Sequence, residues 1–275
     1  MKHYVLCQHG FMGSRIDFQT FVAHLDNAET IIVPLVANEG KTLDGVEKAG
    51  NRCLTEIVDF IQSNTCNESV FVSVLGHSMG GLILRFALRE ICLADPEYWT
   101  RNHVTLKLAI FIATPHTGVP TQMPLIQTGA DLALKSPILM QISDEYGQSS
   151  LNAFQNGVVL YGNLVRDKFV SAESALICAK VHAVQAGDAC MIIAAYEVPH
   201  VPHTTAIDTS STIRELLNTG VKNIKRFLVQ SPPAWPQFLQ RLDNSAHGRI
   251  IAHGQLDRAK VGMPMIHHLA NILIQ

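Results

Sequence analysis

The stretch VLGHSMGGLIL, residues 74–84, places a serine among glycines directly after an apolar run. The residues before it, 69–75, read as a buried strand, and the residues after it, 81–91, read as a helix. A serine on a sharp strand-to-helix turn holds its hydroxyl at the carboxyl edge of a sheet, and flanking glycines let neighbouring elements approach closely. The G-x-S-x-G pattern therefore predicts Ser78 as a nucleophile; a glycine-rich turn without chemistry is the alternative.

Composition limits the classes of protein to which this chain can belong. Its 275 residues are enough for one large α/β domain and few for two. Hydrophobic residues make up 47% and charged residues 16%, which excludes a disordered protein or a coiled coil. A formal net charge of −2 gives no general attraction to nucleic acid. No apolar run approaches the ~18 residues that a membrane-spanning helix requires.

The N-terminal segment and the cysteines indicate an intracellular protein. The apolar run in MKHYVLCQHG is too short for a secretion signal and has no small-residue cleavage site after it. The six cysteines form no C-x-x-C pair, so reduced thiols in the core are expected. We therefore expect a cytoplasmic location.

Apolar runs alternate with helical patterns along the chain, and the runs are hydrophobic on both faces. This combination predicts an α/β fold with a mostly parallel central sheet and helices on both faces. The predicted strands are 4–7, 31–36, 69–75, 106–113 and 158–161, and the predicted helices are 42–61, with Thr42 as N-cap, 81–91 and 261–274.

No linker or repeat divides the chain, so a single domain over residues 1–275 is predicted. Residues 119–156 lack a strand pattern and follow a strand end, which suggests a cap segment over the site; an ordinary helical connection is the alternative. The apolar residues between 123 and 140 fit either an acyl pocket or core packing. Residues 179–230 give no readable pattern.

A serine nucleophile needs N–H donors for the oxyanion that develops during reaction. One candidate is the amide of Met79, the residue after Ser78. The second must come from another loop at the same edge of the sheet. The Gly-bracketed loop after the first strand, QHGFMG, makes the Phe11 amide that candidate, and His9 is expected to pack beneath the loop.

Six blocks of sequence resemble the α/β-hydrolase superfamily and, within it, the eukaryotic lipase-like serine esterases. The resemblance implies an α/β-hydrolase fold, ester hydrolysis without a cofactor, and acyl-lipid or other small-molecule ester substrates. It leaves peripheral membrane contact open. The blocks are HGFMGSRIDF (9–18), KTLDGVEKAGNRCLTEI (41–57), GHSMGGLILRFAL (76–88), FIATPHTGV (111–119), LYGNLVRDKFVSAESA (160–175) and SAHGRIIAHG (245–254).

A hydrolase triad of this kind runs serine, acid and histidine in chain order. Asp167 follows the apolar strand and a Gly-Asn turn, and the resemblance points to the same residue; a turn or capping aspartate is the alternative. His247 follows a short run, 238–242, and a polar turn, and its block resembles the histidine loop of the family. His268 and His253 are the alternatives for the base.

Other residues and other functions offer three further interpretations. His200 and His203 have an H-x-x-H spacing, but no carboxylate or thiol accompanies them, so no metal site is expected. A non-catalytic binding or regulatory protein on a hydrolase scaffold is possible because fold alone does not fix function. An acyltransferase or thioesterase would use the same acyl-serine and cannot be separated from an esterase by sequence.

Overall fold

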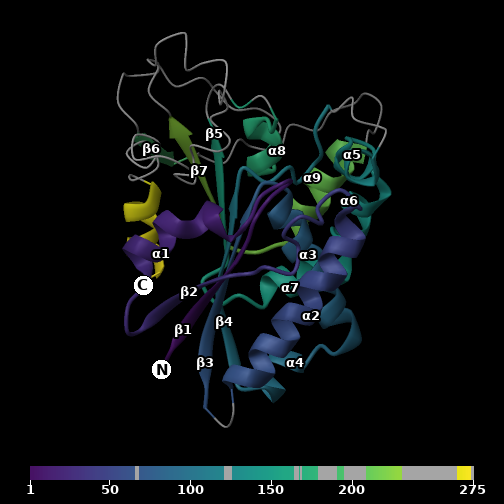
Figure 1. Ribbon diagram of the computed structural model, residues 1–275. Helices are drawn as coiled ribbons and strands as arrows, with labels where there is room; N and C mark the ends of the chain where they lie inside the picture. The colour runs from purple at the N-terminus through teal and green to yellow at the C-terminus, as the bar shows by residue number, and fades with distance from the viewer. Residues whose placement is uncertain are drawn as a thin grey trace.

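The computed structural model describes residues 1–65, 68–120, 126–163, 167, 169–178, 191–194, 209–230 and 265–273. Among these residues seven strands form one sheet, in the order β2-β1-β3-β4-β5-β7-β6 (Figure 1). All neighbours pair in parallel except β6, which lies at the edge antiparallel to β7. The strands are β1 His3–Gln8, β2 Thr30–Pro34, β3 Val70–His77, β4 Val104–Ile112, β5 Val158–Asn163, β6 Met191–Ala194 and β7 Ile224–Gln230.

Helices cover both faces of this sheet, as predicted. Side chains of a strand alternate between its two faces, and β1 shows the result: Tyr4 and Leu6 join one buried cluster, Val5 and Cys7 the other. In Figure 1, α1 and the helix over 265–273 lie on one side, and α2, α3 and α7 on the other. The helices are η1 Arg15–Phe18, α1 Gln19–Leu25, α2 Val46–Asn64, α3 Met79–Ala94, α4 Tyr98–Arg101, α5 Gln127–Leu132, α6 Pro137–Gln141, α7 Glu145–Asn152, α8 Ala172–Leu176 and α9 Thr209–Gly220.

Helix α2 begins later than the sequence predicts. Thr42 is not its N-cap; Gly45, at φ 101°, holds that position. The Thr42 hydroxyl instead accepts the amide of Met12 at 2.8 Å. The Val46 amide at the start of the helix donates to Asp131 Oδ2 at 2.6 Å. The prediction was wrong because the acceptor for the helix start comes from α5, far along the chain, rather than from the local sequence.

The predicted cap segment, 119–156, contributes in part to the main core. α6 and α7 carry buried side chains of the larger cluster, Leu139 and Leu151 among them. Arg89 of α3 donates to the carboxylate of Asp144, which also caps α7. These contacts tie α7 to α3, while a cap role for the segment stays a prediction.

Residues 179–230 gave no readable pattern in the sequence, and their described part, 191–194 and 209–230, contains three elements that complete one side of the sheet. α9 buries Ile213 and Leu217, one turn apart, against the core. β7 pairs in parallel with β5 from Ile224 onward and carries β6 at its outer edge. The predicted strand at 238–242 lies outside the described residues.

A buried histidine makes the stability of the sheet sensitive to acid. His3 Nε2 lies 2.8 Å from Ser73 Oγ on the neighbouring strand. Burial, aided by the charge of Lys107, lowers the pKa of His3 to about 4. An unfolded chain protonates this residue near the ordinary pKa of 6.5. Stability from the neutral ring is therefore present above pH 6.5 and is lost as the pH falls toward 4.

We predict that His3→Gln, which keeps an amide to bond Ser73 but cannot titrate, weakens this pH dependence. Between about pH 7 and pH 4 the native protein should lose about 1–2 kcal/mol more unfolding free energy than the variant. Urea unfolding at a series of pH values measures the free energy of unfolding of the native protein and of the variant. Parallel losses in the two proteins would show that His3 is not the titrating group.

Candidate active site

Ser78 occupies the turn between β3 and α3 in a strained backbone conformation. Its φ of 55° and ψ of −132° are unfavourable for a residue with a side chain. Two hydrogen bonds hold the turn: Ser78 N donates to Ile112 O at 2.9 Å, and Gly81 N donates to Ser78 O at 3.0 Å. Ser78 is half-buried, while its neighbours His77 and Met79 are buried. The turn thus exposes the serine at the carboxyl edge of the sheet.

The two glycines of the G-x-S-x-G pattern are required by close approach. A Cβ on Gly76 would come within 2.4 Å of Gly81 Cα at the start of α3. A Cβ on Gly80 would come within 2.2 Å of Gln8 O at the end of β1. Any side chain at either position would push α3 away from the sheet. The pattern therefore reflects packing around Ser78, as the sequence predicted.

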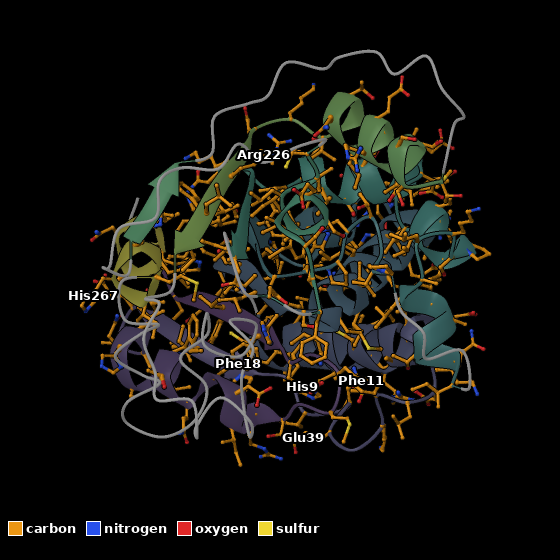
Figure 2. All side chains as sticks on the ribbon, turned by 90° about the horizontal axis from the view of Figure 1, so that it is seen from above. His9, Phe11, Phe18, Glu39, Arg226 and His267 are labelled. Atoms are coloured by element: carbon orange, nitrogen blue, oxygen red, sulfur yellow. The ribbon has the colours of Figure 1, made fainter. Side chains whose placement is uncertain are left out.

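The loop after β1 lies directly against the serine. A Cβ on Gly10 would lie 2.8 Å from Ser78 Cβ and 3.3 Å from Ser78 Oγ. Phe11 follows at once in the sequence, and Figure 2 labels His9 and Phe11 in the same part of the view from above. The turn uses other amides for its own bonds: Met12 N donates to Thr42 Oγ1 and Gly13 N to Gly10 O. The Phe11 amide, and that of Met79, stay the predicted oxyanion donors.

Asp167 lies on the loop that follows β5, at the same edge of the sheet as Ser78. Its carboxylate accepts hydrogen bonds from Asn163 Nδ2 at 2.8 Å, Phe169 N at 3.0 Å and Val170 N at 2.9 Å. These donors fix the orientation of the carboxylate. Its role as the triad acid stays a prediction, because His247 and the alternative base His253 lie outside the described residues.

His268 has a packing role in the structure. Its Nδ1 lies 2.8 Å from the hydroxyl of Tyr161, and its ring packs edge-on against Phe227, with 4.5 Å between ring centroids. Burial lowers its pKa. The neighbouring His267 is exposed. This arrangement anchors the last helix to β5 and β7, and His247 stays the predicted base.

A buried arginine on α3, the helix after Ser78, was not predicted from the sequence. Arg85 is 1% exposed, and no carboxylate within the described residues pairs with it. Its guanidinium donates to Ser143 Oγ at 2.7 Å, Ile142 O at 2.9 Å and His116 Nδ1 at 3.2 Å. Burial lowers the pKa of Arg85 to about 9, which keeps it charged at neutral pH. The sequence signal that could have identified this residue is a single arginine within the apolar run LILRFAL.

His116 follows β4 and is excluded as a general base by this contact. Because an arginine only donates, His116 Nδ1 is the acceptor and the neutral ring carries its proton on Nε2. Burial and the charge of Arg85 hold the pKa of His116 well below its usual range. The pair joins α3 to the loop after β4 and to the segment between α6 and α7.

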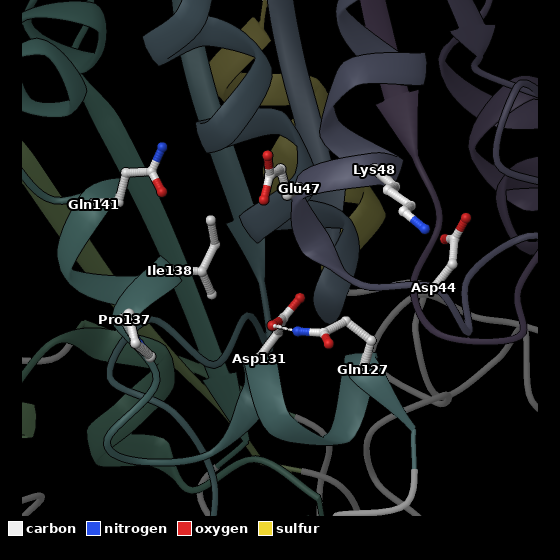
Figure 3. A pocket seen from close by; sticks show the side chains of 8 residues that line it. All are labelled: Asp44, Glu47, Lys48, Gln127, Asp131, Pro137, Ile138 and Gln141. Atoms are coloured by element: carbon white, nitrogen blue, oxygen red, sulfur yellow. Dashed lines mark hydrogen bonds between the residues drawn. The ribbon is translucent and has the colours of Figure 1, made fainter.

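A pocket of about 520 Å³ lies away from these residues, between α2, α5 and α6 (Figure 3). Asp131, one of its carboxylates, is already engaged: Oδ1 accepts from Gln127 and Oδ2 from the start of α2. None of the predicted site residues lines it. The lining residues are Asp44, Glu47, Lys48, Gln127, Asp131, Pro137, Ile138 and Gln141.

The described residues hold no group of three or more histidine, cysteine, aspartate or glutamate side chains that could bind a metal ion. His200 and His203 lie outside them. In the same part of the chain, no helix has the length and hydrophobicity needed to cross a membrane.

A mostly parallel sheet with a serine on a strained strand–helix turn defines the α/β-hydrolase fold. Residues 1–180 match the family described as "Putative serine esterase (DUF676)". Since this is well over half of the chain, the protein belongs to that family, as the resemblance indicated.

The chain is also similar to individual proteins. A Saccharomyces cerevisiae protein described as "Putative lipase YDL109C" is 27% identical over 192 residues, which cover 62% of this chain and 29% of the yeast protein. TT1662 from Thermus thermophilus has 11% identity and a TM-score of 0.52, over 100% of this chain and 90% of that one, and shows the fold alone. Phospholipase PlaB from Legionella pneumophila, at 12% identity and a TM-score of 0.45, aligns over 63% of this chain and 44% of its own.

We predict that Gly10→Ala lowers the reactivity of Ser78 by about 100-fold while the protein stays folded. The new methyl group would meet Ser78 Cβ at 2.8 Å and displace either the serine or the loop after β1. Displacements of about 1 Å at a reacting group cost about 10²-fold in rate. The rate of labelling by a fluorophosphonate measures the effect.

Gly40→Ala is the matched control for this variant. Gly40 lies in an exposed turn at φ 69°, and a Cβ there meets nothing within 4 Å. It should lower stability through backbone strain but leave the labelling rate unchanged. Equal labelling of Gly10→Ala and the native protein would mean that the loop after β1 does not border the reactive group.

Proposed function

We propose that this protein is a carboxylic ester hydrolase that works through an acyl intermediate on Ser78. The observation that carries the proposal is the strained turn at Ser78, with the Gly10 backbone lying against its side chain. A left-handed serine costs stability and persists only when its surroundings impose it. Membership of a serine esterase family supports hydrolase activity.

In the proposed mechanism, His247 takes the proton of Ser78 Oγ as this oxygen attacks the ester carbonyl. Asp167 holds the imidazole and stabilises its charged form. The amides of Phe11 and Met79 stabilise the oxyanion of the tetrahedral intermediate, and α3 directs the positive end of its dipole to the same place. His247 then protonates the departing alcohol. Water, activated by His247, cleaves the acyl-serine and releases the acid.

Lipid esters are the proposed substrate class, and peripheral contact with a membrane is part of this proposal. Two loops at the site carry exposed apolar side chains: Met12 is 77% exposed beside Phe11, and Phe169 is 60% exposed beside Asp167. Such side chains suit an apolar substrate surface. The yeast relative is described as a lipase. In the segment between 123 and 140, Leu139 packs in the larger core cluster, which fits the core-packing alternative for that residue.

We propose a cytoplasmic location because the cysteines described in the structure are free thiols. Cys7 and Cys53 are free thiols buried in the core, and burial raises the pKa of both. Such thiols are unreactive and fit a reducing compartment. Cys66 and Cys190 lie outside the described residues.

Hydrolysis of p-nitrophenyl esters, from acetate to palmitate, tests the proposal. Ser78→Ala and His247→Ala should each lower kcat by about 10⁴-fold or more, because each removes a partner in proton transfer and attack. Asp167→Asn should lower kcat by about 10³- to 10⁴-fold. Ser73→Ala is the control. Ser73 is a buried serine of β3, the strand that leads to Ser78, and it is hydrogen-bonded to His3. It should keep its kcat.

Each result has a separate meaning. Full activity of Ser78→Ala would end the acyl-serine account. Full activity of His247→Ala alone would move the base to another histidine. A folded native protein that hydrolyses no ester would favour a binding or regulatory protein on this scaffold. Transfer of the acyl group to an added alcohol in preference to water would identify an acyltransferase.

A further inference from the structure

We propose that His9 is a positioning residue that orients the Phe11 amide toward the oxyanion. The proposal deepens the proposed function and rests on it. His9 is fully buried and does not reach the surface where a substrate would bind. It acts through the carbonyl of Gly10, to which its Nδ1 lies at 3.0 Å.

The geometry of one peptide group connects His9 with the oxyanion. The Gly10 carbonyl and the Phe11 N–H belong to the same planar peptide unit, in which the two bonds point in opposite directions. The Gly10 oxygen is held from two sides, by His9 Nδ1 at 3.0 Å and by Gly13 N at 3.1 Å. Fixing this oxygen fixes the direction of the Phe11 N–H. His9 thus determines the direction of the Phe11 N–H without contacting it.

The protonation of the ring follows from this contact. A carbonyl oxygen only accepts, so His9 Nδ1 must carry the hydrogen. In the neutral ring Nε2 is then a bare acceptor, and it is buried with no hydrogen-bond partner among the described residues. An unsatisfied buried nitrogen lowers stability, and an apolar side chain of similar size would avoid this loss. The ring is therefore explained by its Nδ1 contact rather than by packing.

The held peptide lies next to the nucleophile. A Cβ on Gly10 would lie 2.8 Å from Ser78 Cβ, so the Gly10–Phe11 unit borders the reacting group directly. The far side of the turn is held by Met12, whose φ is 54° and whose amide donates to Thr42. Figure 2 shows His9 and Phe11 together on this loop. His9 thus braces one side of the turn and Thr42 the other.

Preorganised donors act on the oxyanion of the transition state and not on the substrate ester. If His9 aims the Phe11 amide, its loss should lower kcat with little effect on KM. A role in packing alone would change stability and the amount of folded protein but would leave the kcat of the folded protein unchanged.

Three substitutions separate these roles in the full-length protein. His9→Leu removes the donor and keeps an apolar side chain. His9→Asn places an amide nitrogen where Nδ1 stands, and His9→Gln places one where Nε2 stands. His24→Leu is the control, because His24 Nδ1 bonds a backbone carbonyl, Thr20 O, at 2.8 Å within α1, on another segment.

With p-nitrophenyl butyrate, His9→Leu and His9→Gln should lower kcat by about 10- to 100-fold, less than the loss of a whole oxyanion donor, with KM within about twofold. Their affinity for a trifluoromethyl ketone inhibitor should fall by the same factor. His9→Asn should recover most of kcat, and His24→Leu should match the native protein. The thermal midpoint of His9→Leu should equal or exceed the native value.

Equal kcat values for His9→Asn and His9→Gln would overturn the proposal, even if His9→Leu does not fold. So would a His9→Leu protein with native kcat; in both cases the hydrolase proposal stands. A native protein that neither hydrolyses esters nor binds the inhibitor would overturn the proposed function, and the role of His9 with it.

Discussion

The left-handed backbone of Ser78 is the constraint on which the rest of the site depends. Such a conformation costs about 1–3 kcal/mol in a residue with a side chain, so the surrounding fold must impose it. β3 and β4 hold the turn through the Ile112 carbonyl, and α3 closes it through Gly81. The bare backbone of Gly76 and Gly80 lets sheet and helix meet closely enough for this. The loop after β1 can then reach the serine only because Gly10 also lacks a side chain.

The parts of the site that depend on neighbours in sequence could be predicted. The turn at Ser78, the strand before it and the mostly parallel sheet could be predicted from glycine positions and apolar runs. These signals depend only on residues that are close together in the sequence. The loop after β1 was also placed correctly beside Ser78, because parallel strands bring their carboxyl ends to one edge. Family resemblance pointed to Asp167, and the structure places it on the loop after β5, as expected.

Features that depend on distant partners could not be predicted. The local sequence predicts Thr42 as an N-cap, yet its hydroxyl accepts a hydrogen bond from Met12 N. The amide at the start of α2 donates to Asp131 instead. Arg85 interrupts an apolar helix pattern, and only the fold shows that His116 and the residues after α6 surround it. β7 contains Lys225 and Arg226 within its apolar run, so its pairing with β5 is visible only in three dimensions. His9 was expected to pack under the loop; its bond to the Gly10 carbonyl required coordinates.

Activation of Ser78 by the fold would be seen most plainly as a covalent adduct on this residue. The folded protein and protein unfolded in urea would each be treated with a fluorophosphonate. Intact mass spectrometry would count the adducts, and peptide digestion followed by mass spectrometry would locate the modified residue. We expect one adduct in the folded protein, located on Ser78, and none in the unfolded protein. An adduct on another residue, equal labelling of the unfolded chain, or no adduct on the folded protein would show that the fold does not activate Ser78.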